Sequence, residues 1–350
     1  MTLRILIGMA AAAILSSCGN KQQAACEGAA APMKIIFETD MGNDVDDALA
    51  MDMLMQYARE GKIDLLGISS NKRNDGSTEY IDLLTTWYGM PQIPIGKVVD
   101  GAKCDDAVNY ALAVAQMTDA DGKPLFARSH DNDGFVVPSV EMYRRILSVQ
   151  PDSSVTVVSV GFSTNLAQLL DSKGDDISPL TGKELVAKKV KELVTMAGEF
   201  TNNGEADSLK RMPEYNVVRD IAAAKKVFAE WPTPIVTSPF ELGIKICFPA
   251  DVVENELTRA TPHPVSEAYK AYLPMPYDRP TWDLTSVLYA VEGSEGYFTL
   301  SDTGDIEVDG RGGTRFIARP DGTRRYLMTD SVQDANILRR FVEMIPGEKK

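Results

Sequence analysis

Five carboxylates lie within ten residues near the start of the chain, in segment 38–47 (ETDMGNDVDD). Carboxylates this close together repel one another, and a hard cation relieves the repulsion. Oxygen ligands on a loop suit Ca²⁺ or Mg²⁺, and Ca²⁺ tolerates irregular geometry. Asp46 and Asp47 also stand where a helix is expected to begin, and acids there cap the helix and interact favourably with its dipole. Capping explains one or two acids but not all of them, so the segment predicts a metal site.

Charge and histidine content limit the other chemistries that this chain supports. Its 350 residues carry Lys+Arg 36 against Asp+Glu 50, a formal net charge of −14. Nucleic acids and anionic lipids are bound through clustered Lys and Arg, so both are unfavourable partners. With 2 His, a three-His zinc site is excluded, and a Ser-His-Asp triad would need His130 or His263. A small neutral molecule or a cation remains as the ligand class.

Strand-like and helix-like segments alternate along the chain and must position these acids. Apolar runs that predict buried strands cover residues 34–40, 63–70, 155–161, 192–198 and 234–239. Apolar residues at helical spacing lie between them, as in 46–58 and 77–88. The alternation predicts right-handed βαβ crossovers and an open, mostly parallel, Rossmann-like α/β sheet flanked by helices. Short strands with Gly and Asp turns over 297–328 predict a small antiparallel appendage near the C-terminus.

The first predicted strand ends in the acidic segment. Open parallel sheets bind ligands at the carboxyl ends of their strands, so we expect the metal site at that edge. No internal repeat or long linker interrupts the chain after residue 32, which predicts one large α/β domain over residues 33–350.

The first residues are similar to a lipoprotein signal peptide. Arg4 precedes an apolar run, 5–15, that is too short to span a bilayer as a helix. The sequence LSSC ending at Cys18 resembles a bacterial lipobox, which predicts removal of residues 1–17 and lipidation of Cys18. Small polar residues over 18–32 predict a flexible tether. We therefore expect a bacterial cell-envelope lipoprotein, facing the periplasm, that contacts the membrane only through its lipid anchor; cleavage at another position, giving a secreted protein, is the alternative.

The remaining cysteines, Cys26, Cys104 and Cys247, are spaced too widely for a zinc knuckle. A disulfide between Cys104 and Cys247 in an oxidising compartment and two isolated thiols both remain open.

Segment 38–50 (ETDMGNDVDDALA) resembles the N-terminal motif of the inosine-uridine-preferring nucleoside hydrolases, with two extra residues between Gly42 and Asp46. Later segments are similar to other motifs of that family in the same order: 155–166 (VTVVSVGFSTNL), 194–198 (VTMAG), 213–227 (PEYNVVRDIAAAKKV) and 281–290 (TWDLTSVLYA). Each segment alone is a weak signal, but the ordered set is strong. The resemblance implies Ca²⁺-dependent hydrolysis of the N-glycosidic bond of a ribonucleoside or related ribosyl compound, for nucleoside scavenging. Homo-oligomers are common in the family.

The resemblance also implies a role for each matching residue. Asp40 would be a calcium ligand and the general base that activates a water held by Ca²⁺. The other calcium ligands would be Asp47, Asp283 and the backbone carbonyl of Val160. The residues implied to bind ribose or to line the sugar site are Asp46, Asn71, Met196, Glu214 and Asn216. His130 lies in a segment (HDNDG) that loosely matches the family's loop near the base.

The chain departs from the family pattern where the leaving base is handled. Trp282 stands where many members have the His that protonates the base; an indole cannot supply that proton, although its ring can stack on a base. Tyr277 or Asp278 could supply the proton instead. Glu38 also replaces the family's first Asp. The alternatives to catalysis are therefore calcium-dependent binding of a nucleoside or ribose without turnover, and a purely structural calcium site.

Overall fold

Strand β1 (Met33–Thr39) lies in the middle of a parallel sheet because its side chains are apolar on both faces. Ile35 and Phe37 pack into one hydrophobic core, and Ile36 packs into a second core on the opposite face. A strand buried on both faces has a nearly continuous apolar sequence. β1 pairs in parallel with β2 (Ile63–Ser70) on one side and β5 (Val155–Ser159) on the other.

The computed structural model describes residues 31–102, 108–130, 135–201, 210–257 and 262–345. The predicted signal peptide, Cys18 and Cys104 lie outside these ranges, so the lipidation and disulfide predictions are not tested. The described residues from Pro32 onward belong to one compact unit. Within them, every helix is too short or too polar to span a lipid bilayer.

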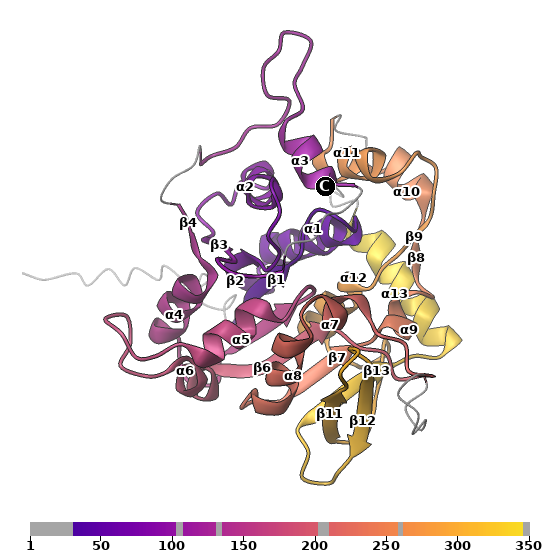
Figure 1. Ribbon diagram of the computed structural model, residues 1–350. Coiled ribbons are helices and arrows are strands. Elements are labelled where there is room, and N and C mark those ends of the chain that lie inside the picture. Colours follow the sequence, from indigo (N-terminus) through magenta and orange to yellow (C-terminus); the bar gives the residue numbers. More distant parts are fainter. Residues whose placement is uncertain (1–30, 103–107, 131–134, 202–209, 258–261, 346–350) are drawn as a thin grey trace, which may run out of the picture. The chain divides into compact units, whose positions relative to one another are not determined.

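The described part of the chain forms an 11-stranded sheet in the order β12-β11-β13-β7-β6-β5-β1-β2-β3-β4, with β10 paired to β13 (Figure 1). Its other strands are β3 (Ile95–Lys97), β4 (Val136–Pro138), β6 (Val190–Met196), β7 (Ile235–Ser238), β10 (Thr299–Leu300), β11 (Gly304–Val308), β12 (Thr314–Ala318) and β13 (Arg324–Met328). The neighbouring strands in the part of the sheet ordered β13-β7-β6-β5-β1-β2-β3-β4 all pair in parallel. The pairs β10–β13, β11–β13 and β11–β12 are antiparallel. β8 (Cys247–Phe248) and β9 (Arg279–Pro280) form a separate antiparallel pair.

Helices cover both faces of the sheet. The core that contains Phe37 is shared by α1 (Asp46–Arg59), α2 (Ser77–Trp87), α3 (Tyr110–Ala115), α11 (Pro264–Tyr272), α12 (Asp283–Glu292) and α13 (Ser331–Met344). The core that contains Ile36 is shared by α4 (Ser139–Val149), α5 (Thr164–Asp171), α6 (Gly182–Lys189) and α8 (Ile221–Glu230). Three short helices, α7 (Tyr215–Arg219), α9 (Phe240–Gly243) and α10 (Ala250–Asn255), lie in the connections.

The predicted α/β class is confirmed, and the structure adds how the C-terminal strands attach. β13 pairs in parallel with β7, with Arg324 opposite Ile235, so these strands continue the main sheet. Arg324 is 5% exposed, and its guanidinium donates to the carbonyls of Phe228, Trp231 and Thr233 at the end of α8. A buried guanidinium must find acceptors, and these carbonyls hold β13 against the sheet edge.

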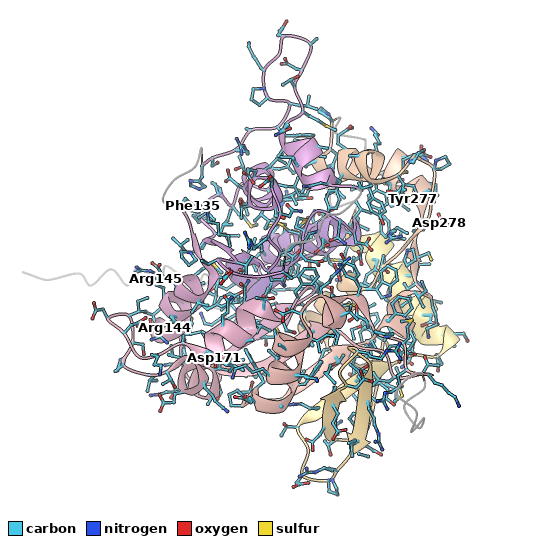
Figure 2. All side chains as sticks on the ribbon, in the orientation of Figure 1. Phe135, Arg144, Arg145, Asp171, Tyr277 and Asp278 are labelled. Carbon is cyan, nitrogen blue, oxygen red and sulfur yellow. The ribbon has the colours of Figure 1, made fainter. Side chains whose placement is uncertain are left out.

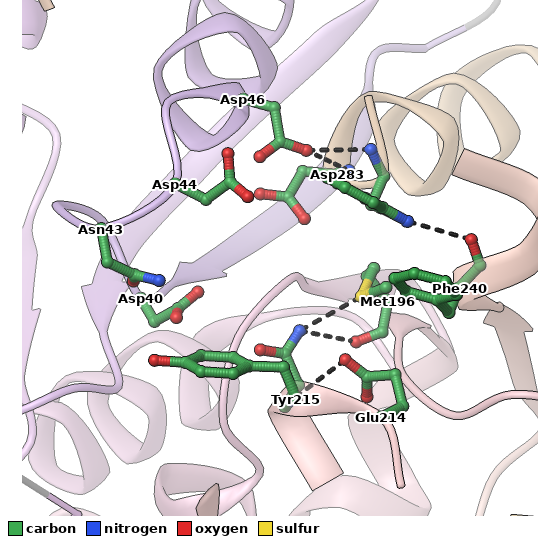
Figure 3. Close-up of a pocket in the computed structure, with 11 residues that line it drawn as sticks. Asp40, Asn43, Asp44, Asp46, Met196, Glu214, Tyr215, Phe240 and Asp283 are labelled. Carbon is green, nitrogen blue, oxygen red and sulfur yellow. Dashed lines mark hydrogen bonds between the residues drawn. The ribbon is translucent and has the colours of Figure 1, made fainter. Parts of the chain in front are cut away.

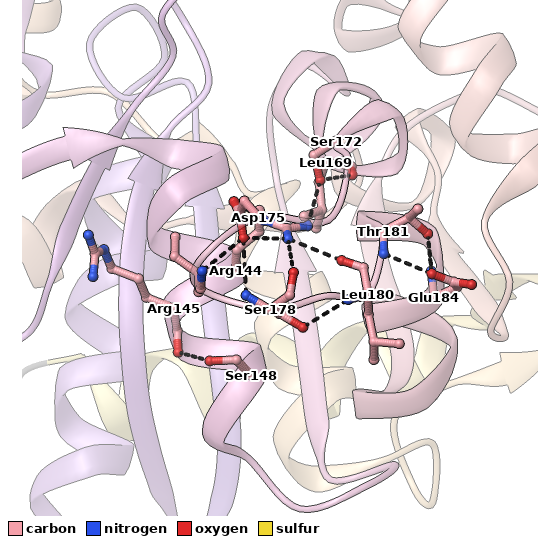
Figure 4. A network of polar contacts seen from close by, with 11 residues as sticks. Arg144, Arg145, Ser148, Leu169, Ser172, Asp175, Ser178, Leu180, Thr181 and Glu184 are labelled. Carbon is pink, nitrogen blue, oxygen red and sulfur yellow. Dashed lines mark hydrogen bonds and ion pairs between the residues drawn. The ribbon is translucent and has the colours of Figure 1, made fainter.

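The layer of α4, α5 and α6 contains a second buried guanidinium, that of Arg144 (Figure 4). Its Nε and Nη2 donate to the two carboxylate oxygens of Asp175 at 2.9 and 2.7 Å. Nη2 also donates to the carbonyls of Ser178 and Leu180. The next residue, Arg145, has a side chain that is 62% exposed (Figure 2). Arg144 therefore fixes the connection between α5 and α6 and takes no part in the site described next.

Candidate metal centre and active site

A cavity of about 300 Å³ lies at the carboxyl ends of β1, β6 and β7, the edge of the sheet where the sequence predicts a site (Figure 3). Asp40 follows β1, Met196 ends β6, and Phe240 follows β7. Asp283, the first residue of α12, closes the cavity from the C-terminal part of the chain. The parallel strands therefore bring these distant segments together.

Three buried carboxylates, those of Asp46, Asp47 and Asp283, offer oxygen atoms within 4.8 Å of one another. Burial, followed by the charges of neighbouring carboxylates, raises the pKa of Asp47 and Asp283 well above the usual range. Oδ1 of Asp47 accepts a hydrogen bond from Thr39, while Oδ2 is buried with no hydrogen-bond partner among the described residues. A cluster of hard oxygen donors with an unsatisfied oxygen fits a divalent cation such as Ca²⁺ or Mg²⁺, which would favour the ionised carboxylates.

Asp40 lines the same cavity and is 5% exposed. Its charge contributes to the raised pKa of Asp47, after burial, and more weakly to that of Asp283. The predicted carbonyl ligand, that of Val160, lies at the end of β5 and accepts a hydrogen bond from Nδ2 of Asn216 at 3.3 Å. Of the four predicted ligands, Asp40 and Asp283 line the cavity, whereas Asp47 and Val160 are not among the described residues of its lining. Asp47 belongs to the tight group of three with Asp46 and Asp283, and Asp40 does not.

Asp46 joins the two ends of the chain. Its Oδ2 accepts hydrogen bonds from the backbone N–H groups of Trp282 at 2.9 Å and Asp283 at 3.1 Å. It thereby caps the N-terminus of α12 with a negative charge, which the helix dipole favours. Burial and the adjacent Asp44 carboxyl raise the pKa of Asp46. The sequence predicted a ribose ligand here, and the structure places Asp46 beside the acids as well as in the cavity lining.

Glu214 lies on the other side of the cavity, below Asp46 and Asp283 in Figure 3. Asn216, two residues along the chain, also lines the cavity. Oε1 of Glu214 accepts from the N–H of Asn216, and Oε2 accepts from the N–H groups of Gly198 and Val217. Burial raises the pKa of Glu214 to about 7 despite these three bonds. Nδ2 of Asn216 donates to the carbonyl and the sulfur of Met196 at 3.1 and 3.2 Å. The predicted sugar-binding residues are thus held rigidly by backbone contacts.

Trp282 and Phe240 form an aromatic wall of the cavity. Their ring centroids are 5.5 Å apart in a stacked arrangement, and Nε1 of Trp282 donates to the carbonyl of Phe240 at 2.9 Å. The indole N–H is therefore already used. Tyr277 donates to the carbonyl of Tyr269, and Asp278 accepts from the N–H of Ala250. Neither Tyr277 nor Asp278 is among the described residues that line the cavity, so neither is in position there to protonate a leaving base.

His130 and Asn71 are not among the described residues of this lining. The His130 ring stacks on Phe135 at 3.4 Å, and its Nε2 lies 2.7 Å from the carbonyl oxygen of Pro91, beside a separate hollow of about 20 Å³. Asn71 is fully buried behind the site; a Cβ at Gly161 would lie 2.5 Å from its Oδ1, so that close approach requires glycine. A role for His130 near the base stays a prediction.

Three lining residues were not predicted as part of the site: Asn43, Tyr215 and Phe240. Asp44 belonged to the predicted acidic segment but had no role assigned to it. Phe240 could have been found because it follows a predicted strand at the ligand-binding edge. Tyr215 lies between two predicted ligands. Asn43 and Asp44 belong to the segment with the two extra residues, and the pairing of Asp44 with Arg279, 235 residues away, left no local signal.

Solved structures of nucleoside hydrolases share this fold. A plant nucleoside hydrolase is 19% identical and has a TM-score of 0.64, with 89% of this chain and 99% of that chain covered. A purine-preferring ribonucleoside hydrolase from Gardnerella vaginalis is 18% identical, with a TM-score of 0.64 and coverage of 90% and 98%. An inosine-uridine preferring nucleoside hydrolase from Bacillus anthracis is 17% identical, with a TM-score of 0.62 and coverage of 89% and 99%.

At these low identities, the TM-scores show a common fold. No curated protein sequence matches the chain. The sequence model of the family described as inosine-uridine preferring nucleoside hydrolase matches residues 35–337, which include the acidic cluster, Glu214, Asn216 and Asp283. The chain therefore belongs to this family of nucleoside N-ribohydrolases.

Proposed function

We propose that this nucleoside hydrolase depends on Ca²⁺ and uses Asp40 as its general base. One observation carries the proposal: the buried acids Asp46, Asp47 and Asp283 meet at one side of a cavity whose other side holds Glu214 and Asn216. A cation would neutralise the acids on one side, and the hydroxyl groups of a sugar would form hydrogen bonds with Glu214 and Asn216 on the other. The substrate class is a ribonucleoside or a related ribosyl compound.

The residues that would hold the ion are Asp40, Asp47, Asp283 and the carbonyl of Val160. All these ligands are oxygens, and Ca²⁺ accepts irregular sets of carboxylate and carbonyl oxygens. When bound, the ion supplies Lewis-acid polarisation of the attacking water. Asp46 keeps the N-terminus of α12, and with it Asp283, in place through two backbone hydrogen bonds.

The side chains of the chain itself perform the remaining steps. Asp40 accepts a proton from the attacking water, a role that a carboxylate in the lining of the cavity can perform. As the C1′–N bond breaks, its electron pair moves to the base and positive charge grows on the ribose, where the nearby carboxylates stabilise it. Glu214, whose two oxygens have lone pairs beyond those used by the three backbone N–H groups, accepts from a ribose hydroxyl. Trp282 offers its ring to the departing base.

Release of free ribose from a panel of nucleosides, with Ca²⁺ and with a chelator, tests the proposal. We expect ribose from the wild type only when Ca²⁺ is present. Loss of a general base costs about 10²–10⁴-fold in rate, so Asp40→Asn is expected to lose at least that factor while remaining folded. No ribose from any nucleoside, or equal rates for the wild type and Asp40→Asn, would refute it.

A second function is favoured by the indole of Trp282, whose N–H is bound to Phe240 and not available to a leaving base. In this alternative the protein binds nucleosides or ribose with Ca²⁺ and does not turn them over. It predicts Ca²⁺-dependent thermal stabilisation by inosine without any release of ribose, which the same assay separates from hydrolysis.

We also propose that the mature protein begins at Cys18 and carries its lipid there. The lipobox-like sequence that ends at Cys18 supports this envelope location. Mass spectrometry of the membrane fraction is expected to find a diacylglyceryl-modified Cys18 at the N-terminus. A Cys18→Ser variant should then appear in the soluble fraction; an unchanged membrane location would contradict the proposal.

A further inference from the structure

Asp44 and Arg279 form an ion pair at the edge of the cavity. Nε of Arg279 donates to Oδ1 of Asp44 at 2.9 Å, and Nη2 donates to Oδ2. The side chains are 19% exposed for Arg279 and 28% exposed for Asp44, so the pair is largely shielded from solvent. Two parallel N–H···O bonds fix the orientation of a guanidinium as well as its position. Asp44 lies in the segment that has two extra residues compared with the family motif.

Arg279 in turn packs against aromatic rings. Its guanidinium carbon lies 5.4 Å from the ring centroid of Trp282 and 5.0 Å from that of Tyr272. Cation–π contacts of this length are attractive, and more so when they are partly desolvated. Trp282 is also held by Phe240, through the stacked rings and the indole hydrogen bond. The aromatic wall of the cavity is therefore supported by Phe240 and by the guanidinium that Asp44 orients.

Asp44 supports this wall and also adjoins the acidic cluster, since its carboxyl, after burial, raises the pKa of Asp46. Both of its oxygens are occupied by Arg279. The group of acids whose oxygens lie within 4.8 Å of one another contains Asp46, Asp47 and Asp283 and does not contain Asp44. The charge of Arg279 opposes that of Asp44 beside the cluster, although the effect of Asp44 on the pKa of Asp46 is the larger of the two. Within the pair, the guanidinium is the group that contacts the aromatic wall.

We propose that Arg279, oriented by Asp44, is a positioning residue that determines leaving-group specificity by fixing Trp282 as the surface on which a planar heteroaromatic base stacks. This inference deepens the function proposed above and rests on it. It assigns the preference for an aromatic leaving group to an ion pair whose guanidinium packs against the rings of Trp282 and Tyr272. A ligand without a base, such as free ribose, gains nothing from the pair.

The chain offers a closely matched control in another ion pair, Arg340 with Glu292. These side chains are 18% and 19% exposed, and Arg340 lies 5.7 Å from the ring centroid of Tyr57. Glu292 is at the opposite end of α12 from Asp283, roughly 13 Å away along the helix. Arg340→Gln therefore removes the same kind of contact at a distance from the cavity, and Arg279→Lys keeps the charge while losing the two-fold hydrogen bond.

The test measures how tightly inosine and ribose bind to the full-length chain that carries Arg279→Gln, Arg279→Lys or Arg340→Gln. If the wild type hydrolyses inosine, KM and kcat are measured with ribose as a competitive inhibitor; if it does not, calorimetry gives both dissociation constants directly. We expect Arg279→Gln to raise the KM or the dissociation constant of inosine about tenfold. The inhibition constant of ribose, the Ca²⁺ affinity and kcat should change by less than about threefold. Arg279→Lys should fall between, and Arg340→Gln should match the wild type.

Three results would overturn the inference. Arg279→Gln could weaken inosine and ribose equally, which would place Arg279 on the sugar or metal side. Arg279→Gln could bind inosine as tightly as Arg340→Gln does, which would give the Asp44–Arg279 pair a structural role only. The wild type could bind inosine no more tightly than ribose, so that the wall contacts no base. Failure of the proposed hydrolysis is a separate result, seen as absence of released ribose from the wild type.

Discussion

The carboxylate of Asp46 accepts a hydrogen bond from the backbone N–H of Asp283 at 3.1 Å, although 237 residues separate them. The first acid of α1 thus caps the helix whose own first residue is an acid of the same cluster. One side chain therefore orients a neighbouring ligand and also adds charge to the site. These two tasks can be separated by substitution.

Asp46→Asn should separate the cap from the charge. Its side-chain oxygen can still accept from the N–H groups of Trp282 and Asp283, whereas the negative charge is gone. We expect Ca²⁺ affinity, measured by calorimetry, to fall at least about tenfold. The free energy of unfolding in chelator should not decrease, because repulsion within the cluster is relieved. Asp46→Ala should in addition lose about 1 kcal/mol from the missing cap. Wild-type Ca²⁺ affinity in Asp46→Asn would limit Asp46 to the capping role.

Removal of the metal should destabilise the fold. Without a cation, the buried acids Asp46, Asp47 and Asp283 face one another with raised pKa values. A ligand of the folded state at about one hundred times its Kd adds about 2.7 kcal/mol. Thermal unfolding is therefore expected at a higher Tm with Ca²⁺ than with a chelator, and the difference should vanish in Asp47→Asn. Mg²⁺ serves as the comparison ion. Equal Tm values with Ca²⁺ and with chelator would argue against the metal centre.

Glu214→Gln should damage the sugar side of the cavity. Both oxygens of Glu214 accept from backbone N–H groups, and the amide nitrogen of Gln would face one of those donors. Leaving a buried donor unsatisfied costs about 1–3 kcal/mol, which urea unfolding would measure. KM for a nucleoside should rise as the start of α7 shifts. A variant with wild-type stability and KM would show that the carboxylate is not needed in this place.

Stability should depend on pH through Asp52, a fully buried acid of α1 outside the cavity lining. Burial raises its pKa from 3.8 to about 7, although the hydrogen bonds from Tyr88 and Gln56 oppose the shift. The folded state then keeps a proton that the unfolded state has lost. Its contribution to stability is therefore full below about pH 4 and is lost as the pH rises to about 7.

Asp52→Asn remains neutral, so its free energy of unfolding should stay flatter between those two pH values. The difference from the wild type is expected to reach up to roughly 4 kcal/mol above pH 7. Urea unfolding across the pH range measures it, with Asp64→Asn as the control, since the Asp64 side chain is 53% exposed. Parallel curves for the wild type and Asp52→Asn would show that Asp52 ionises normally.

The sheet could be predicted because strands buried on both faces leave continuous apolar runs. The predicted strand 63–70 coincides with β2, and Asp40 follows β1 as expected, whereas Glu38 lies within the strand. β4 has three residues and ends in Pro138, so it left no recognisable run. The parallel pairing of β13 with β7 depends on buried contacts of Arg324 that local sequence does not express.

The site was predictable where a residue adjoins a strand end or a helix start, as Asp40 and Asp283 do. Contacts between distant segments were not predictable. The indole of Trp282 was expected near the base, but its bond to the carbonyl of Phe240 follows from the packing of α9 on α12. His130 was linked to the base through five residues of loose similarity, and its described contacts are with Phe135 and Pro91.

The span of 237 residues between Asp46 and Asp283 has a consequence for the order of folding. Closing so long a loop costs conformational entropy before any contact across it forms. During synthesis the acids of α1 emerge long before α12, so a nascent chain carries only part of the cation site until strands β1 to β7 of the sheet have been made. The ion is therefore expected to bind late in folding. It would stabilise the folded state and would not nucleate folding.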